Sequence, residues 1–264
     1  MTIIIGRMIW VFKHGKLKAS DKTNMTGIRA YKMFLKRCRE EGIDMEKYAL
    51  SKEEGLKVKK TIESPLIFNT YKAKTFYHVN HLDFNSAWPS SVIAKYPELE
   101  PVYAKLNKDA KNVFNGYAQS EYSNYKFALI AQAGINGCNA IIRDYIWNRL
   151  PQAGFEVLGV NTDGIWYRDK TGQGRVYHDE NEGEGFGKWK TDYVDCEWYA
   201  TSDGQYFFIT PDGKFHARAR GDYLYSYAKP YEDWDSEEDY FKAIKTRCAV
   251  LYDHTTKHLY IRRF

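Results

Sequence analysis

The chain has 264 residues, 44% of them hydrophobic, so it is long enough to bury a proper core, and an intrinsically disordered chain is excluded. Lys and Arg number 39, Asp and Glu number 34, and the formal net charge of +5 permits an anionic partner without requiring one. No run of about 18 apolar residues and no C-x-x-C pair is present, which predicts a soluble cytoplasmic protein without a membrane span, zinc motif or redox motif.

The N-terminal part predicts a strand followed by a basic helix. The apolar run from Ile3 to Phe12 is typical of a strand, and from Gly27 to Glu41 the apolar residues recur at helical spacing. The other face of this helix carries Lys32, Lys36, Arg37 and Arg39. Two interpretations of this face stay open, simple solvation or contact with nucleic acid.

The middle of the chain predicts alternating strands and helices. The segment TFYHVNHLDF (75–84) is typical of a strand, and a helix is expected to start at Pro89. Residues 120–150 predict two helices, or one long helix kinked around Ala133–Gly137. The strand EVLGVN (156–161), the turn Thr162-Asp163-Gly164 and the strand IWYR (165–168) together predict a β-hairpin.

The C-terminal part predicts mostly strands. After a surface loop at 178–187, the expected elements are strands around Glu197–Thr201, Gln205–Thr210 and Lys214–Ala219, a turn at Pro211–Gly213, an acidic stretch (231–240), a short basic helix near Phe241–Arg247 and a last strand pair ending at Phe264.

Two acidic residues lie where a strand ends or turns. Asp83 ends the strand at 75–84, and Asp163 is at the apex of the hairpin. If these strands are neighbours in one sheet, the two carboxylates converge, and paired carboxylates with open coordination positions suit Mg²⁺ or Mn²⁺. The alternative is that Asp83 caps a helix and Asp163 is a turn residue, which are both common roles.

The surroundings of these residues resemble three ordered motifs of family B DNA polymerases. The segment DFNSAWPS (83–90) is similar to the first motif, D-x-x-S-L-Y-P-S. The resemblance implies that Asp83 is a metal ligand, helped by the carbonyl of Phe84. Trp88 replaces the Tyr that excludes a 2′-hydroxyl. The positions implied to contact the incoming nucleotide are Phe84, Ser86, Ala87 and Trp88.

The second motif, K-x-x-x-N-S-x-Y-G, resembles KFALIAQAG (126–134). It implies that Lys126 is catalytic and reaches the triphosphate, and that Ile130 and Gly134 line the nucleotide site. On a helix, Lys126, Ile130 and Ala133 would share one face. A solvent-exposed helical lysine is the alternative for Lys126.

The third motif, Y-G-D-T-D-S, resembles GVNTDG (159–164). Its second Asp, the family's essential metal ligand, is kept as Asp163. Asn161 replaces the first Asp and keeps an oxygen that can act as a ligand, which predicts slower or metal-altered chemistry.

The strands after the third motif resemble a primer-binding stretch of protein-primed phage polymerases, which carries a K-x-Y element. Tyr206 matches its aromatic residue, whereas Gly204 stands in place of its Lys. Arg218 and Arg220, at alternate positions of one strand, are expected to contact DNA phosphates. The alternative is two arginines on an exposed strand face.

The resemblance covers residues from about 75 to 225 and implies an α+β fold: a polymerase palm with an antiparallel sheet and packed helices, short helical fingers and a small β-rich thumb. The expected division is an N-terminal region (1–74), a palm (75–95 and 138–200), fingers (96–137) and a thumb-like region (201–264). The implied function is a template-directed DNA polymerase core that adds deoxynucleotides to a primer 3′-hydroxyl by two-metal phosphoryl transfer.

The implied cofactor is Mg²⁺ or Mn²⁺, and the implied partners are primer–template DNA, dNTPs and a separate exonuclease, primer or processivity subunit. A phage or other viral setting would place the protein in the host cytoplasm. Two other functions stay open: a primase-like RNA polymerase, which Trp88 argues against, and a catalytically lapsed palm that serves as a DNA-binding or replication assembly subunit. Retention of both Asp83 and Asp163 argues against lapse, because a buried carboxylate pair is costly without a metal.

Overall fold

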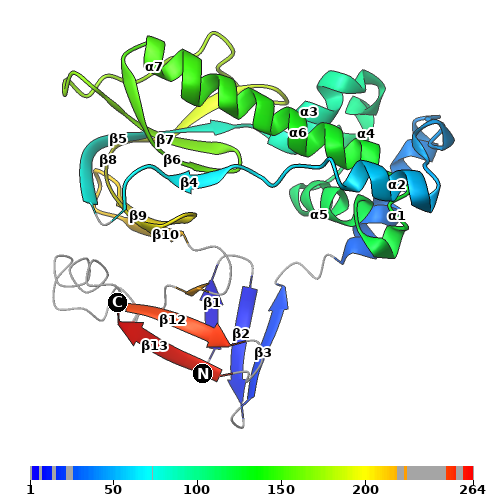
Figure 1. The fold of residues 1–264 in the computed structure, drawn as a ribbon, viewed down its shortest axis with the longest axis horizontal. Helices are drawn as coiled ribbons and strands as arrows, with labels where there is room; N and C mark the ends of the chain where they lie inside the picture. Colours follow the sequence, from blue (N-terminus) through cyan, green and yellow to red (C-terminus); the bar gives the residue numbers. More distant parts are fainter. Residues whose placement is uncertain are drawn as a thin grey trace. The chain divides into compact units, whose positions relative to one another are not determined.

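The computed structural model describes residues 2–5, 8–13, 16–21, 26–72, 74–218, 223–224, 248–253 and 258–263. The fold is a mixture of helices and antiparallel strands, as the sequence predicts (Figure 1). Two compact units interleave along the chain. Unit 1 comprises 1–22, 68–80 and 193–264, and unit 2 comprises 23–67 and 81–192. The predicted division into palm, fingers and thumb stays a prediction.

The strands in the described part of the chain form three sheets. The largest has seven strands in the order β10-β9-β8-β5-β7-β6-β4, and the two others have the orders β1-β2-β3 and β11-β12-β13. The bounds in the large sheet are β4 (Ile67–Asn69), β5 (Lys74–Phe84), β6 (Phe155–Asn161), β7 (Gly164–Asp169), β8 (Trp189–Ser202), β9 (Gln205–Ile209) and β10 (Phe215–Arg218). Those in the small sheets are β1 (Thr2–Ile5), β2 (Met8–Lys13), β3 (Lys16–Asp21), β11 (Tyr223–Leu224), β12 (Cys248–Asp253) and β13 (His258–Arg263).

The helices described belong to unit 2. Their bounds are α1 (Gly27–Glu40), η1 (Glu46–Tyr48), α2 (Lys52–Lys59), α3 (Ala87–Lys95), η2 (Pro97–Leu99), α4 (Glu100–Ala104), α5 (Lys108–Ala118), η3 (Glu121–Ser123), α6 (Ala128–Asp144), the π-helix η4 (Tyr145–Arg149) and α7 (Leu150–Gln152). Local signals fix several starts: the Thr26 side chain caps α1, and Ser51 and Glu54 form a capping box on α2. Among the described helices, none is long and apolar enough to cross a membrane.

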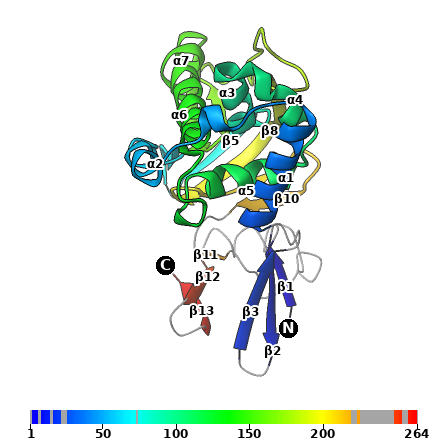
Figure 2. The ribbon, with the colours of Figure 1, turned by 90° about the vertical axis from the view of Figure 1, so that its right-hand side faces the viewer.

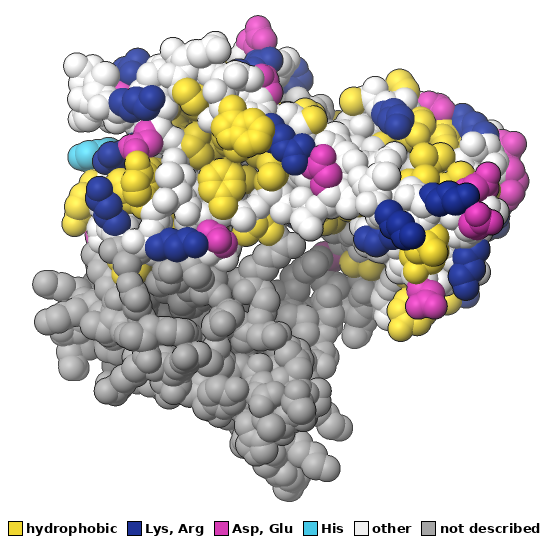
Figure 3. Space-filling view, viewed as in Figure 1, with side chains coloured by type: hydrophobic (Ala, Val, Ile, Leu, Met, Phe, Trp, Pro, Cys, Tyr) yellow, Lys and Arg dark blue, Asp and Glu magenta, His cyan; other side chains and the backbone are white. Residues whose placement is uncertain are grey.

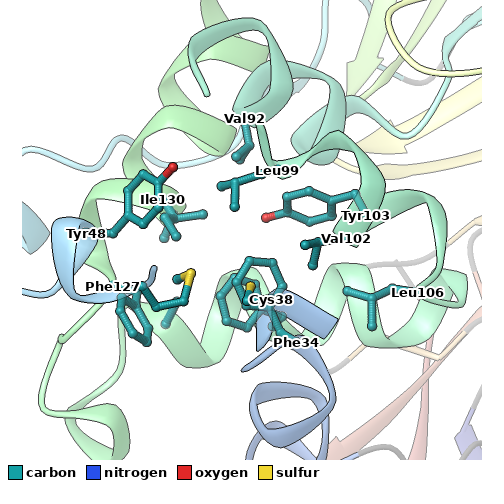
Figure 4. Close-up of a cluster of buried hydrophobic side chains, with 14 of the residues drawn as sticks. Phe34, Cys38, Tyr48, Val92, Leu99, Val102, Tyr103, Leu106, Phe127 and Ile130 are labelled. Carbon is teal, nitrogen blue, oxygen red and sulfur yellow. The ribbon is translucent and has the colours of Figure 1, made fainter. Parts of the chain in front are cut away.

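A hydrophobic core joins α1 to α3, α4, α5 and α6 (Figure 4). The rings of Phe34 in α1 and Phe114 in α5 stack with centroids 3.8 Å apart, and Figure 2 shows these two helices side by side. Burying a side chain of this size contributes roughly 1.5–3 kcal/mol. The fully buried members include Ala30, Phe34, Cys38, Val92, Leu99, Val102, Tyr103, Phe114 and Ile130. This core therefore fixes α5 and α6 relative to α3, which follows the Asp83 strand.

Several predicted elements are confirmed and some bounds are corrected. The 155–169 hairpin, the basic helix and the Pro211–Gly213 turn are present. The run from Ile3 to Phe12 forms two strands, β1 and β2, and α3 begins at Ala87, before Pro89. The strand expected near Glu197 begins already at Trp189. The expected features at 231–240 and 241–247 lie outside the described residues.

The predicted kink around Ala133–Gly137 is wrong, because α6 runs through it unbroken. Its two glycines serve packing against α3: a Cβ at Gly134 would lie 3.2 Å from Val92 Cγ2, and one at Gly137 would lie 3.0 Å from Ser91 Cβ. Glycine therefore marks a close helix contact here, and the irregular turn comes later, in η4.

Candidate active site

The structure brings Asp83 and Asp163 together within unit 2. The N–H of Phe84, at the end of β5, donates to the carbonyl of Asp163 at 2.9 Å, so the peptide after Asp83 is bonded to the hairpin turn. The two carboxylates act on each other: the pKa of Asp163 is raised to about 6, first by burial and then by the charge of Asp83. The predicted convergence of the two strands is therefore observed.

A third carboxylate and a lysine, which the sequence analysis missed, adjoin Asp83. Lys190 Nζ lies 2.9 Å from Asp192 Oδ1 and 3.4 Å from Asp83 Oδ2. The pKa of Asp83 is raised, first by burial and then by Asp192, while Lys190 acts in the opposite direction. Lys190 and Asp192 are at alternate positions of β8 and so share a face of the sheet. The K-x-D spacing in the sequence could have indicated this shared face.

Lys108, the first residue of α5, is the second cation near the carboxylates. Its charge lowers the pKa of both Asp83 and Asp163, opposing the effect of burial. Nothing in the sequence singled it out, because it belongs to none of the three motifs.

Lys126 differs from its predicted placement. Helix α6 begins at Ala128 with Phe127 as its N-cap, so Lys126 precedes the helix and does not share a helical face with Ile130 and Ala133. Its ammonium lies 3.0 Å from Glu46 Oε1. Ile130 is fully buried in the core, and Gly134 packs against the backbone of Trp88. The contacts of these residues with a nucleotide stay predictions.

The first motif is tied to the glycine-rich loop before β8. The Asn85 N–H donates to the carbonyl of Lys188 at 2.9 Å, and the Asn85 side chain donates to the carbonyl of Gly183 at 2.8 Å. Ser90 Oγ accepts the N–H of Gly187 at 2.8 Å. Ser86 has a left-handed backbone (φ +49°) and stays exposed ahead of α3, whereas Ala87 is buried and Trp88 half-buried. The loop therefore has a fixed position beside the first motif.

His81 fills the space beside Gly164, the last residue of the segment 159–164. A Cβ atom on Gly164 would overlap His81 Nε2. The His81 ring is held there by Trp166, with centroids 4.5 Å apart, and its Nδ1 lies 3.9 Å from Asp192 Oδ2. Two residues before Asp83 on β5, His81 points to the same face of the strand. Asn161 ends β6 and is half-buried.

The residues expected to contact DNA belong to unit 1. Tyr206 is buried at 4% exposure, and its ring lies 6.1 Å from Trp198 and 6.4 Å from Phe208 between centroids. Arg218 ends β10 and is the register partner of Tyr206. Arg220 lies outside the described residues. DNA contact by these three residues stays a prediction.

The donor chemistry fits a hard divalent cation, although the metal itself stays a prediction. Within the part of the chain that the structure describes, no three or more His, Cys, Asp and Glu side chains are grouped as metal ligands. Mg²⁺ commonly uses only one or two protein carboxylates and completes its shell with water and substrate phosphates. Asp83 and Asp163 supply this number of carboxylates, and their mutual repulsion would be relieved by a cation.

Comparison with known proteins gives a likeness of fold. No protein-family model matches the sequence, and no curated protein sequence matches it. The structure of phi29 DNA polymerase complexed with single-stranded DNA matches 74% of this chain with a TM-score of 0.51 at 10% identity, and this chain spans 59% of that protein. The structure of a family B DNA polymerase from the hyperthermophilic archaeon Pyrobaculum calidifontis matches 76% of this chain with a TM-score of 0.43 at 15% identity, and the match covers 34% of that polymerase. The chain thus has an α+β fold that resembles part of a DNA polymerase.

Proposed function

We propose that this chain is a template-directed DNA polymerase core that adds deoxynucleotides to a primer 3′-hydroxyl. The observation that carries the proposal is the adjoining pair Asp83 and Asp163, joined through the Phe84 N–H and coupled in charge, within a fold that resembles part of a DNA polymerase. Two adjoining half-buried carboxylates concentrate negative charge at a place where a divalent cation can bind.

Asp83 and Asp163 would hold Mg²⁺ or Mn²⁺ in their ionised forms, with the Phe84 carbonyl and Asn161 as further oxygen donors. Bound divalent ions supply Lewis-acid activation of the 3′-hydroxyl and stabilise charge on the leaving pyrophosphate. Lys108 places a positive charge beside both carboxylates and is a candidate to offset charge on a triphosphate. Lys190 bridges Asp83 and Asp192 and so fixes the orientation of the Asp83 carboxylate.

The nucleotide would contact Ser86, Ala87 and Trp88, with Trp88 excluding a 2′-hydroxyl by its bulk. Primer–template DNA is the proposed partner, and the single-stranded DNA in the phi29 polymerase structure supports a nucleic-acid partner of this class. Family B membership, a phage or other viral setting in a host cytoplasm, and a separate exonuclease, primer or processivity subunit belong to the same proposal.

A catalytically lapsed palm that only binds DNA is the second candidate, and one observation favours it. The Lys190 ammonium lies 2.9 Å from Asp192 Oδ1 and 3.4 Å from Asp83 Oδ2, and the Lys126 ammonium lies 3.0 Å from Glu46 Oε1, so both cations have carboxylate partners within the protein. In an active enzyme Lys126 must release Glu46 before it can reach a triphosphate.

Extension of a labelled primer on templates of defined sequence, with Mg²⁺ or Mn²⁺ and with either dNTPs or NTPs, separates these functions. We expect metal-dependent addition of the templated deoxynucleotide and poor use of ribonucleotides. Preferred use of ribonucleotides would indicate a primase-like enzyme. DNA binding without extension in either metal would contradict the polymerase and support the lapsed palm.

A further inference from the structure

The turn that carries Asp163 has a strained backbone. Thr162 has a φ of +65°, which is rare for a β-branched residue, and the Asp163 N–H donates to the carbonyl of Asn161 at 2.8 Å. A residue in such a conformation persists only when its surroundings hold it there. The position of the Asp163 carboxylate therefore depends on what holds Thr162.

Both peptide groups of Thr162 are held from outside the hairpin. Its N–H donates to the carbonyl of Leu66 at 2.8 Å, and its carbonyl accepts the thiol of Cys138 at 3.7 Å. Cys138 is part of α6, and Leu66 ends the segment Thr61–Leu66 that links α2 to β4. The thiol is a weak donor, so the Leu66 carbonyl is the stronger of the two supports.

The Thr61–Leu66 segment is itself bound to α6 by side-chain amides. Asn136 accepts the Glu63 N–H at 2.9 Å and donates to the Thr61 carbonyl at 3.0 Å. Asn139 accepts the Leu66 N–H at 3.2 Å and donates to the Ser64 carbonyl at 2.9 Å. These amides are three residues apart on one helix face and satisfy main-chain groups of a segment that lies outside the described helices and strands.

Two further side chains of α6 form hydrogen bonds with the Thr61–Leu66 segment but do not contact Leu66. Arg143 forms a bidentate pair with the Glu63 carboxylate at 3.1 and 2.5 Å. Gln132 donates to the Thr61 hydroxyl at 2.7 Å. Gln132 thus belongs to the same helix face but is remote from the Thr162 support.

We infer that Asn139 is a positioning residue for Asp163. Its side chain is 2% exposed and binds the peptide groups on both sides of Pro65, including the N–H of Leu66, whose carbonyl holds Thr162. Through these bonds, helix α6 fixes the position of the turn that carries Asp163. The catalytic consequence rests on the proposed function, whereas the link from Asn139 to Thr162 does not.

The test compares Asn139→Ala with Gln132→Ala. The second variant removes one hydrogen bond between α6 and Thr61 but leaves the hydrogen bond between Asn139 and the Leu66 N–H intact. Hydrogen exchange at the Thr162 amide, binding of Mn²⁺ and single-nucleotide extension are measured on each. Asn139→Ala loses three hydrogen bonds, with the Leu66 N–H, the Ser64 carbonyl and the Glu63 carboxylate. Because the loss of one hydrogen bond corresponds to about tenfold, we expect at least about tenfold faster exchange at Thr162, weaker Mn²⁺ binding and a lower kcat at unchanged KM for dNTP in Asn139→Ala alone.

Equal exchange at Thr162 in the two variants would overturn the inference. If the wild type does not extend primers, the proposed function fails, but exchange and Mn²⁺ binding still decide the role of Asn139. If Asn139→Ala does not fold, Asn139→Ser takes its place, because a serine side chain is too short to bind the Leu66 N–H and the Ser64 carbonyl together. Faster exchange at Thr162 in that variant would support the inference, and the wild-type rate would overturn it.

Discussion

Asp163 is costly to ionise, because its carboxyl group is half-buried and lies near the negative charge of Asp83. Its pKa is raised from 3.8 to about 6, so the folded chain holds a proton in this interval that the unfolded chain has released. The contribution of Asp163 to the free energy of unfolding therefore falls as the pH rises from about 4 to about 6 and is lowest above that range. Catalytic carboxylates commonly show such a conflict between stability and function.

Asp163→Asn removes this cost while nearly keeping the shape of the side chain. We expect the variant to be more stable than the wild type by about 2 kcal/mol near pH 8 without metal, and to lose this advantage near pH 4. Urea unfolding of both proteins at the two pH values, in a metal chelator, measures the difference. A variant that is less stable than the wild type near pH 8 would show that the Asp163 carboxylate is already neutralised in the fold.

At this scale the sequence predicted the local placement of Asp83 and Asp163 correctly, whereas their catalytic role stays a prediction. Asp83 and Asp163 end or turn strands, and a strand end can be read from a few neighbours. Lys108, Lys190, Asp192 and His81 were missed because their relation to the carboxylates depends on strands and helices that are distant in sequence. Lys126 was misplaced for the same reason: its partner Glu46 comes from η1.

Helix α1 confirms the predicted basic face and refines its members. Arg37 is turned toward Glu40, at 2.6 Å. The exposed side chains at spacings of three and four residues, which form one stripe, are Arg29, Lys32, Lys36 and Arg39, and of these Lys36 lies 3.8 Å from Glu40. A rise of 1.5 Å per residue gives this stripe a length of about 15 Å, comparable to a few phosphates along a strand. In Figure 3, the described surface over α1 and α2 carries Lys and Arg side chains beside Asp and Glu.

Replacing Arg29, Lys32, Lys36 and Arg39 with Gln is expected to weaken binding of single-stranded DNA and to reduce its salt dependence, by roughly 0.7 in log–log slope for each phosphate that the stripe neutralises in the wild type. The matched control replaces four lysines that already pair with carboxylates, Lys57, Lys72, Lys105 and Lys214. Fluorescence anisotropy over a range of salt measures both. If both variants bind DNA with the same reduced affinity, the stripe is only a solvated face.

Helices and strands with a strong hydrophobic periodicity were predictable from the sequence. The tertiary contacts between α6 and α3 and between Thr61–Leu66 and Thr162 were not. The hairpin around Asp163 and helix α1 follow from alternation and helical spacing, which are local properties. The break expected in α6 failed because Gly134 and Gly137 lower helix propensity yet permit contact with α3, so tertiary packing outweighs propensity. The Thr61–Leu66 segment has no periodic signal, and its support of Thr162 became visible only in the fold.

At the scale of the whole molecule, the likeness to phi29 DNA polymerase lies in the fold and hardly in the sequence. Ten per cent identity to phi29 DNA polymerase accompanies a TM-score of 0.51, so the likeness is one of backbone fold, which many residue types satisfy. At Gly164, His81 fills the space that a Cβ atom would need, which is a constraint particular to this chain. Function must therefore be argued from the site and not from the fold.

The most direct measurement is primer extension by the wild type, Asp83→Asn and Asp163→Asn, with Asp212→Asn as a surface control and DNA affinity measured in parallel. Asp212 pairs with Lys214 in a turn of unit 1. We expect both site variants to lose extension by at least about a thousandfold while binding primer–template DNA with nearly unchanged affinity, and the control to match the wild type. Extension at the wild-type rate by either site variant would contradict the assignment of Asp83 and Asp163 as the catalytic carboxylates.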